Sequence, residues 1–586
     1  MDYAIIADAY GKIEATTKRL EMTDILVDLL KNSPKEVVSR IVYLTQGKLY
    51  PDFVGVEIGI AEKLAVKALV RASGMKEGEV LSDLQKTGDI GQVAEIYLAN
   101  KKQSTFFSKV LTVEHVYESL DKMAKTSGVG TVNMKTTIFA GLLSAASPKE
   151  AKYLMRTATG NLRLGIADMT VLEALAVAYG GGKEARKTIE RAYNICSDLG
   201  RVADMLVQEG INSVKKLQVK VFEPIRPMLA ERLSSPEEIL EKFGGKCLAE
   251  YKYDGERIQV HKQGDNVTLF SRRLENISNQ YPDVANLIRK QIKATEAIFE
   301  AECVAVDLET GDMRPFQELM HRRRKYGVEA AVDQYPISLY TFDLLFVDNK
   351  DLTCEPLTIR RAALEKMLDK NSQLQIASQK VVNSSKELEE FFEEAITGGC
   401  EGLICKSLAK EAIYQAGNRG WLWIKYKRDY KSEMTDTVDL VIVGAFHGRG
   451  KRAGAYGALL LAAYNKEKDI FETVTKCGTG FTDEDIENIY TLLQKNIIPH
   501  KHARVSSMIE AEIWFEPIIV LEILGAEVTL SPIHLCARNS IRKDSGLAIR
   551  FPRFTGKYRT DKSPQDTTTS KEITEMYQNQ LKQIIK

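Results

Sequence analysis

The chain has 586 residues, of which 44% are hydrophobic and 27% charged, and its formal net charge is +1. This length exceeds a single ordinary core and predicts roughly three or four domains. No apolar run approaches the ~20 residues that a membrane-spanning helix requires, and the N-terminal residues lack the series of segments typical of a secretory signal. We therefore expect a cytoplasmic protein without a membrane partner.

The cysteines and histidines do not form a zinc-binding pattern. The eight cysteines include no CxxC pair, and the seven histidines show no HExxH spacing. We expect reduced, buried thiols and no structural zinc. Any metal should be a hard cation held by carboxylates and phosphates, as Mg²⁺ usually is.

The basic residues are clustered although the net charge is close to zero. The clusters lie at residues 321–325, 425–431 and 449–452. Such clusters are most often solvated surface, but a local basic strip is enough to follow a phosphate backbone. Composition therefore leaves nucleic-acid binding open.

Residues 1–222 predict an all-α domain. Apolar residues recur at three- and four-residue spacing in stretches such as 22–44 and 184–210, which is typical of amphipathic helices. The proline-bearing segment that follows marks a change of pattern.

Residues 223–430 predict an α+β domain. Period-2 alternation and β-branched runs indicate strands, and helical spacing returns between them; mixed elements with hairpin-like connections favour α+β over a doubly wound parallel sheet. The expected strands lie at 247–262, 267–273, 297–307 and 337–348, and the expected helices at 358–370 and 385–399.

Residues 431–586 predict a small barrel. Five or so short strands are divided by glycine turns, with one helix expected at 483–497 and a closing helix at 570–586. This combination suits a barrel of the OB type, which is a frequent nucleic-acid platform.

The sharpest local pattern surrounds Lys252, in the segment EYKYDGER. In a strand, alternate residues share a face, so Glu250, Lys252 and Asp254 would lie together. An exposed, ion-paired strand would explain this pattern equally well. A nucleophilic lysine must be unprotonated, and neighbouring carboxylates oppose that unless a divalent cation neutralises them. If Lys252 is a nucleophile, the pattern therefore calls for a metal, with Glu302 and Glu401 as candidate ligands or ribose acceptors.

Seven segments resemble the covalent nucleotidyltransferases, the superfamily of DNA ligases, RNA ligases and mRNA capping enzymes. KYDG at 252–255 resembles motif I of that superfamily, and the other motifs follow in the same order. They are FSRR at 270–273, FEAECVAVD at 299–307, YTFDLLFVD at 340–348, EGLICKS at 401–407, WIKYKRDY at 423–430 and RTDK at 559–562.

The N-terminal half resembles ATP-dependent DNA ligases of the archaeal and eukaryotic type. KYLMRTATGNLRLGIADMTVLEALA at 152–176 is similar to the signature of their helical DNA-binding domain, and RPMLAE and PFQELMHRRRK also match. The similarity runs from about residue 47 to 564, and the form without long extensions looks archaeal. The continuation SPQDTTT after the last motif is less acidic than the family's usual sequence. The resemblance implies a helical DNA-binding domain, a nucleotidyltransferase domain and an OB-fold domain.

This resemblance implies ATP and Mg²⁺ as cofactors and the sealing of nicks in duplex DNA, in replication, repair and recombination. Lys252 would attack the α-phosphorus of ATP, Phe342 would stack on adenine, and Glu302 and Glu401 would hold the metal. The residues that match nucleotide contacts are Glu250, Arg257, Arg272, Glu302, Phe342, Lys425, Lys427, Arg559 and Lys562. Arg559 and Lys562 reach the leaving pyrophosphate only if the barrel swings over the nucleotide, and we expect the hinge at residues 428–432.

The DNA contacts should be to the backbone, because a nick can occur in any sequence. The candidates are Lys135, Arg156, Arg163, Arg449 and Arg452, although such residues are more often solvated surface. The cluster at 322–325 could equally support the fold. Nicked DNA is the expected partner, a sliding clamp is a further candidate, and we expect a monomer in the cytoplasm, associated with the nucleoid.

Three other interpretations share parts of this pattern. An RNA ligase or capping enzyme would carry the same lysine core but lack the helical domain. An NAD-dependent ligase would carry a four-cysteine zinc site that this sequence does not show. A non-catalytic DNA-binding module would keep the fold and lose the reaction, against which every matched catalytic position is present. ADP, GTP or NAD as minor donors stay open.

Overall fold

The structure is a computed structural model of the chain. It describes residues 1–100, 110–306, 313–314, 316–322, 328–368, 373–427, 437–448, 452, 454–525 and 527–585. The chain forms two compact units, Met1–Glu77 with Ala94–Lys427, and Gly78–Val93 with Arg428–Lys586. The first unit contains the predicted α+β region and most of the predicted helical region, and the second contains the predicted barrel. Among the described residues, no helix is long and apolar enough to cross a membrane.

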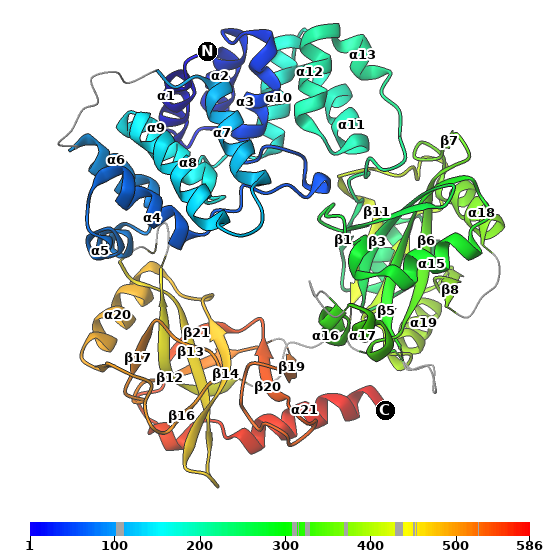
Figure 1. The fold of residues 1–586 in the computed structure, drawn as a ribbon. Helices are drawn as coiled ribbons and strands as arrows, with labels where there is room; N and C mark the ends of the chain where they lie inside the picture. The colour runs from blue at the N-terminus through cyan, green and yellow to red at the C-terminus, as the bar shows by residue number, and fades with distance from the viewer. Residues whose placement is uncertain are drawn as a thin grey trace. The chain divides into compact units, whose positions relative to one another are not determined.

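The described part of the N-terminal region consists of helices joined by loops, as predicted (Figure 1). Its α-helices are α1 (Tyr3–Glu14), α2 (Arg19–Lys31), α3 (Val38–Thr45), α4 (Glu62–Ser73), α5 (Glu77–Thr87), α6 (Ile90–Ala99), α7 (Val113–Lys125), α8 (Thr131–Ala145), α9 (Pro148–Ala158), α10 (Asp168–Tyr179), α11 (Arg186–Cys196), α12 (Leu199–Glu209) and α13 (Ile211–Lys215). Helix α9 shows why local sequence suffices here. Ser147 caps it, Pro148 occupies its first turn, and Glu150 completes a reciprocal capping box, which satisfies backbone groups that would otherwise lack partners.

The α+β region contains two sheets. Its strands are β1 (Leu229–Arg232), β2 (Cys247–Lys252), β3 (Glu256–Gln263), β4 (Asn266–Ser271), β5 (Glu296–Ala305), β6 (Ile337–Val347), β7 (Lys350–Asp351), β8 (Leu374–Ile376), β9 (Gln379–Val382), β10 (Gly402–Lys406) and β11 (Arg419–Lys427). One sheet has the order β1-β11-β10-β2-β9, and the other has the order β4-β3-β5-β6-β7 with β8 beside β6. Most pairs are antiparallel, which confirms α+β rather than a doubly wound sheet.

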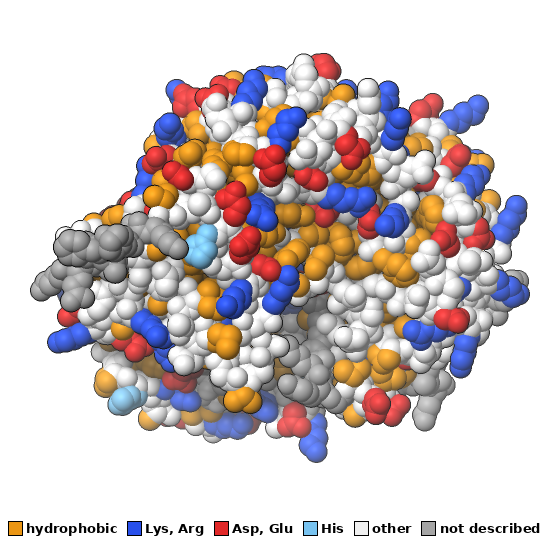
Figure 2. Space-filling view, turned by 45° about the horizontal axis from the view of Figure 1, so that its top comes forward, with side chains coloured by type: hydrophobic (Ala, Val, Ile, Leu, Met, Phe, Trp, Pro, Cys, Tyr) orange, Lys and Arg blue, Asp and Glu red, His pale blue; other side chains and the backbone are white. Residues whose placement is uncertain are grey.

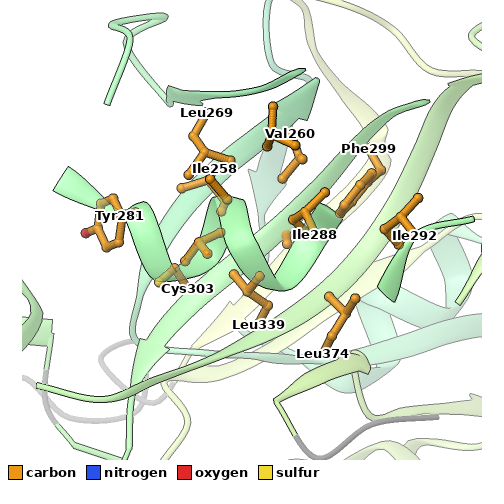
Figure 3. Close-up of a cluster of buried hydrophobic side chains, with 14 of the residues drawn as sticks. Ile258, Val260, Leu269, Tyr281, Ile288, Ile292, Phe299, Cys303, Leu339 and Leu374 are labelled. Carbon is orange, nitrogen blue, oxygen red and sulfur yellow. The ribbon is translucent and has the colours of Figure 1, made fainter. Parts of the chain in front are cut away.

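Helices cover these sheets and supply the core. They are α14 (Pro236–Lys242), α15 (Pro282–Gln291), α16 (Phe316–Leu319), α17 (Val328–Gln334), α18 (Leu357–Met367) and α19 (Ser385–Thr397). Figure 3 shows Ile288 of α15 among Ile258, Phe299 and Leu339 of the larger sheet, and all four are fully buried. Burial of such side chains stabilises the fold by ~1.5–3 kcal/mol each.

Strand β3 also holds the segment that leads from α13 to β1, through side chains on one of its faces. His261 Nδ1 accepts a hydrogen bond from Phe222 N at 2.9 Å, and Gln259 exchanges two hydrogen bonds with the backbone of Ile225 at 2.8 and 3.0 Å. His261 is fully buried, and this burial lowers the pKa of its imidazole to about 3. The ring is therefore neutral, with its proton on Nε2, which faces Gln259 Oε1 at 2.9 Å.

The second unit contains a set of strands around an apolar core. The strands are β12 (Val438–His447), β13 (Tyr456–Asn465), β14 (Ile470–Cys477), β15 (Ile497–Ile498), β16 (Val505–Ser506), β17 (Ile513–Phe515), β18 (Val520–Leu524), β19 (Glu527–Ser531), β20 (Gly546–Arg550) and β21 (Arg553–Tyr558). Helix α20 (Asp483–Gln494) lies between β14 and β15, and α21 (Ser570–Ile585) follows the last strand, as expected. The strands outnumber the five or so predicted, because several are only two or three residues long and carry no periodic signal.

The surface carries mixed charge. On the face drawn in Figure 2, Lys and Arg side chains alternate with Asp and Glu side chains and do not gather in a single patch. This distribution agrees with a net charge of +1 and leaves specific positive strips, rather than overall charge, to contact an anionic ligand.

Candidate active site

Three neighbouring strands bring the predicted catalytic residues to one sheet edge. Lys252 is the last residue of β2 and pairs with Gly402 of β10, which pairs in turn with Lys427 of β11. Glu401 immediately precedes β10, and its backbone N donates to Lys252 O at 2.8 Å. Residues far apart in the sequence thus meet through strand register.

The ammonium group of Lys252 contacts the carboxylate of Glu401 directly. Lys427 Nζ lies 2.7 Å from the same Glu401 oxygen, and the Lys252 and Glu401 side chains are 25% and 28% exposed. Burial disfavours the charged carboxylate, but the two lysines outweigh that effect and lower the pKa of Glu401 to about 2. Lys252 is therefore accessible to a ligand and already held in place.

Two further carboxylates face Lys252. Burial, followed by repulsion from Glu401, raises the pKa of Asp254 to about 6. Burial also raises the pKa of Glu302 to about 7, although Lys252 and Arg257 oppose that shift. Carboxyl groups that resist ionisation beside one another favour a divalent cation.

These carboxylates fit a hard metal ion by their chemistry. Oxygen donors are what Mg²⁺ prefers, together with substrate phosphates. In the described part of the chain, no group of three or more Asp, Glu, His or Cys side chains is already arranged as a metal centre. Because Lys252 and Lys427 bind Glu401, a metal on that carboxylate would have to displace these lysine contacts.

A strip of cations lies along the neighbouring strands. Burial, together with repulsion from Arg419, Lys427, Lys252 and Arg232, lowers the pKa of Lys425. Strands β1 and β11 run parallel, and Arg232 pairs in register with Lys425. Such a strip can bind a polyphosphate by charge-assisted hydrogen bonds.

Arg257 and Phe342 lie close together in the same unit. Arg257 binds both oxygens of the buried Glu300 carboxylate at 2.8 and 2.9 Å, and its Nη1 donates to Met228 O at 2.8 Å. Its guanidinium lies 5.3 Å from the centre of the Phe342 ring. Burial disfavours the charged guanidinium, but Glu300 beside it raises the pKa of Arg257. Most donors of Arg257 are thus used within the protein.

Glu250 belongs to a separate buried group. Its side chain is 2% exposed, lies 2.5 Å from Lys406 Nζ and forms an ion pair with Arg361. Lys406 Nζ also donates to Phe342 O at 3.2 Å. Glu250 and Lys252 share a face of β2, as alternation predicts, yet they have different partners.

Arg559 and Lys562 pair with carboxylates of their own unit. Arg559 Nη1 and Lys562 Nζ each lie 2.6 Å from Asp439 Oδ2. Arg559 also binds both oxygens of Asp561 at 2.8 and 2.9 Å. These contacts lower the pKa of Asp561 to about 2, chiefly through the hydrogen bond from Arg559.

The remaining candidates have surroundings of their own. Arg272 is exposed in the turn after β4, and no hydrogen bond or ion pair among the described residues joins it to the Lys252 group. Arg163 is exposed in the loop after α9 with φ 57°, and half-buried Lys135 extends over Gly59. Arg452 donates to two barrel carbonyls, Gly457 O and Gly478 O.

Arg156 is buried and pairs with Glu14 at 3.0 Å. Burial raises the pKa of Glu14, but hydrogen bonds from Arg156, Tyr153 and Lys152 outweigh it and lower that pKa to about 2. This position gives no support to a direct DNA contact by Arg156. Of the cluster at 322–325, Arg322 is buried and pairs with Asp283 at 2.7 Å, which favours a role in the fold. Arg449, the hinge at 428–432 and residues 323–325 lie outside the described residues.

Sequence reasoning did not select several residues of these groups. Arg232 and Arg419 join the cation strip, while Lys406 and Arg361 hold Glu250. The period-2 pattern of β11 could have identified Arg419, because it shares a face with Lys425 and Lys427. The sequence around Asp439 contains no pattern that would predict its pairing with Arg559 and Lys562.

The fold and the site together define a nucleotidyltransferase: an α+β domain presents an accessible lysine among carboxylates and cations, and a strand barrel accompanies it. Family comparisons extend this assignment to the whole chain. Residues 2–176 match a family described as "DNA ligase N terminus", residues 227–427 match "ATP dependent DNA ligase domain", and residues 452–562 match "ATP dependent DNA ligase C terminal region".

Similar proteins agree over the full length. "DNA ligase 2" of Thermofilum pendens is 56% identical over 99% of this chain and 98% of that protein, and "DNA ligase" of Staphylothermus marinus is 51% identical over 100% of both. A solved structure described as "Pmar-Lig_PreS3" covers 94% of this chain and 99% of its own with a TM-score of 0.55 and 16% identity, and thus supports the fold. The chain belongs to the family of ATP-dependent DNA ligases.

Proposed function

We propose that this protein seals nicks between a 3′-hydroxyl and a 5′-phosphate in duplex DNA, using ATP and a covalent AMP on Lys252. The observation that carries this proposal is the Lys252 group itself: a partly exposed lysine bound to Glu401, facing two further carboxylates and a cation strip. Replication, repair and recombination are the processes that supply such nicks.

The reaction would run in three steps. The neutral amine of Lys252 attacks the α-phosphorus of ATP, so that an N–P bond forms, the nitrogen loses a proton and pyrophosphate leaves. An oxygen of the 5′-phosphate at the nick then takes the AMP, and the N–P bond breaks. Finally the 3′-hydroxyl oxygen loses its proton and attacks the 5′-phosphorus, and AMP leaves. Catalysis of such transfers is mostly positioning and charge neutralisation.

The cations of the site would neutralise the triphosphate. Lys425 and Lys427 would bind at the α-phosphate, with Arg232 and Arg419 beside them. Burial and then repulsion among these cations lower the pKa of Lys425, and an anionic ligand would relieve that repulsion. When ATP arrives, Lys427 exchanges its contact with Glu401 for phosphate. Phosphate thereby frees Glu401 for another role.

Glu302 and Glu401 would hold Mg²⁺, with Asp254 close by. When bound, Mg²⁺ supplies charge neutralisation at the phosphate oxygens. Asp254 and Glu302 fit it because burial and repulsion between carboxylates raise their pKa, and Glu401 fits it as an ionised carboxylate. Glu401 would also release Lys252, and loss of this carboxylate contact favours the neutral amine form of Lys252.

The base and ribose would be bound by the group around Phe342. We propose that Phe342 stacks on adenine and that Glu250 lies near the adenine edge. The donors of Arg257 are used by Glu300 and Met228 O, which leaves the guanidinium little to offer the nucleotide. Arg257 would therefore act by positioning Phe342, next to which it lies. Arg272 would contact the nucleotide from its exposed turn.

We propose domains at 1–222, 223–430 and 431–586, with a hinge at 428–432. DNA contacts would be to the backbone through Lys135, Arg163, Arg449 and Arg452, with the protein a monomer in the cytoplasm, associated with the nucleoid. A sliding clamp is a candidate partner. Arg559 and Lys562 would approach the leaving pyrophosphate when the barrel closes over ATP.

The test is self-adenylylation without DNA. The protein is incubated with α-phosphate-labelled ATP and Mg²⁺ and separated on a denaturing gel, with labelled GTP and NAD in parallel. We expect a label that acid removes and alkali does not, as a phosphoramidate requires. Lys252→Ala should abolish it, whereas Lys290→Ala, an exposed lysine of α15, should not.

Two outcomes would change the proposal. Label from GTP or NAD but not ATP would keep Lys252 and replace the cofactor. A folded sample that takes no label from any donor would leave a DNA-binding module without the reaction.

A further inference from the structure

We propose that Asp439 holds Arg559 and Lys562 in reserve on the barrel and competes with the polyphosphate for them, which sets the affinity for ATP and pyrophosphate in the adenylylation step. This inference rests on the proposed function, in which these two cations act at the leaving pyrophosphate. Asp439 would be a positioning residue, because it touches the cations and not the reacting atoms.

The contacts place a single carboxylate oxygen between the two cations. Asp439 Oδ2 accepts from Arg559 Nη1 and from Lys562 Nζ, each at 2.6 Å. The Asp439 side chain is 9% exposed, and its other oxygen has no hydrogen-bond partner in the described structure. The hydrogen bonds that the described residues give this carboxylate therefore come from these two cations.

The anion is fixed and the cations are less constrained. Asp439 lies in β12 and pairs in register with Glu522 of β18. Its backbone N donates to Thr568 Oγ1 and its carbonyl accepts from Thr568 N, each at 2.9 Å. Arg559 directly follows β21, and its backbone N still donates to Val520 O of β18 at 3.0 Å, whereas Lys562 lies three residues further on in the turn. A rotation of two long side chains can thus release the cations, while Asp439 stays in place.

The same donors cannot serve Asp439 and phosphate at once. Nη1 of Arg559 is on Asp439, and Nε and Nη2 are on Asp561, so each nitrogen of the guanidinium already has a carboxylate partner. Lys562 has three ammonium protons, one of which points at Asp439 Oδ2. Phosphate that takes the donors now on Asp439 Oδ2 must displace this internal anion, and the apparent affinity for ATP then falls by the fraction of those donors that Asp439 retains.

Competition also has a consequence after the reaction. Once pyrophosphate is formed, Asp439 offers the two cations an alternative anion, which favours release of pyrophosphate and departure of the barrel from the nucleotide. A purely structural Asp439 would have no such effect, because it would change stability without changing the balance between ATP and pyrophosphate. The two roles differ in what a neutral substitution does.

The test is Asp439→Asn, which keeps the shape and removes the charge. The full chain is assayed for self-adenylylation over a range of ATP concentrations, and for reversal of preformed lysyl–AMP over a range of pyrophosphate concentrations. We expect the KM for ATP and the half-saturating pyrophosphate concentration each to fall about fivefold, the size of a partly exposed ion pair, with the maximal adenylylation rate changed less than about twofold. Sealing of a pre-adenylated nick, which does not use the triphosphate, should be unchanged.

The matched control is Asp469→Asn. Asp469 is a barrel carboxylate paired with Arg504, is 67% exposed and lies outside β21 and the turn after it, so the same charge change should leave both constants unaltered. Sealing of the pre-adenylated nick reports folding of each variant. If Asp439→Asn does not fold, Asp439→Ser is tested by the same two constants.

Unchanged or raised constants in a folded Asp439 variant would overturn the inference. Arg559→Ala separates this result from failure of the proposed function. If Arg559→Ala slows adenylylation while Asp439→Asn leaves the constants alone, only the reserve role is lost. If Arg559→Ala has no effect on adenylylation, the assignment of Arg559 to the pyrophosphate fails first.

Discussion

Two groups of charged side chains differ in how the fold holds them. The Lys252 group contains Lys252, Glu401 and Lys427, and the Arg559 group contains Arg559, Lys562, Asp439 and Asp561. Around Lys252, charges are half-buried, come from three neighbouring strands and are fixed by strand register. Around Arg559, a turn carries the cations, and the Asp561 partner is 63% exposed. The strand register holds the first arrangement in place, whereas the second depends on residues of a turn and on one exposed carboxylate.

This difference follows from where each group must act. A nucleophile has to be held against its target, because loss of alignment costs rate. A residue that must leave after one step needs an alternative partner of similar strength, and an exposed ion pair of ~0–1 kcal/mol supplies it. Removing a buried charge should therefore lower the free energy of unfolding strongly, and removing an exposed charge should lower it only slightly.

The largest effect should come from a buried ion pair in the unit that contains the Lys252 group. Asp343 and Arg360 form a bidentate ion pair at 2.7 and 3.0 Å, and both side chains are almost completely buried. Asp343→Ala leaves a buried guanidinium without its counter-charge, so we expect the free energy of unfolding to fall by about 3–5 kcal/mol. Urea denaturation followed by tryptophan fluorescence measures it.

Asp561→Ala is the paired comparison in the barrel. It removes an equally bidentate partner of Arg559 that is mostly exposed and screened by solvent, so the loss of stability should be far smaller than for Asp343→Ala. Similar losses for Asp343→Ala and Asp561→Ala would remove the distinction between fixed and exchangeable charge.

The next effect concerns rate and not stability. Glu401→Gln keeps the shape of the residue that binds Lys252 and Lys427 but removes its charge. We expect self-adenylylation to slow about 100-fold, the usual cost of losing one preorganised group, with thermal unfolding nearly unchanged. Glu390→Gln on the exposed face of α19 is the control. An adenylylation rate within about threefold of the wild type would remove Glu401 from the proposed machinery.

Much of this arrangement could be predicted from sequence, and the reasons are local. Helix α9 carries its own capping box, and alternation predicts that Glu250 and Lys252 share a face of β2. The single strand expected at 247–262 is instead two strands, β2 and β3, so the end of β2 at Lys252 was not predicted. That Lys252, Glu302 and Glu401 belong to one site was predicted from the order of the nucleotidyltransferase motifs in which they lie. Short-range chemistry and a shared motif order both leave marks in the sequence.

The partners that were missed are far apart in sequence. Arg156 pairs with Glu14, 142 residues away in the sequence, and Arg559 pairs with Asp439, 120 residues away. Nothing near either arginine indicates whether its charge will be used inside the protein or offered to DNA or ATP. The short strands of the barrel were not predicted either, because two or three residues are too few to show a period-2 pattern.

A further effect is a difference in acid sensitivity. His261 is neutral in the folded protein with a pKa of about 3, below its ordinary value of 6.5, because burial disfavours the charged ring. A lowered histidine pKa means that the unfolded state binds more protons as pH falls. Its contribution to stability is therefore complete above about pH 6.5 and is lost progressively toward pH 3.

Between pH 7 and pH 5 this loss should amount to about 2 kcal/mol in the unit that contains the Lys252 group. The variant His261→Gln still offers an acceptor to Phe222 N but cannot take up a proton, so its stability should depend less on pH. Burial raises the pKa of Glu302 to about 7 and that of Asp254 to about 6, so these groups stabilise the fold as pH falls through those values. The informative quantity is thus the difference between wild type and variant.

Tryptophan positions make this measurement specific to one unit. Trp421 and Trp423 lie on β11 and Trp514 lies on β17, so Trp514→Phe leaves fluorescence only in the first unit. In that background, urea denaturation at pH 7 and pH 5 should show a fall in stability about 2 kcal/mol larger when His261 is present than when the His261→Gln substitution is added. Equal falls would mean that His261 is not buried neutral against Phe222, and the segment from α13 to β1 would then be held by Gln259 and Arg257 without it.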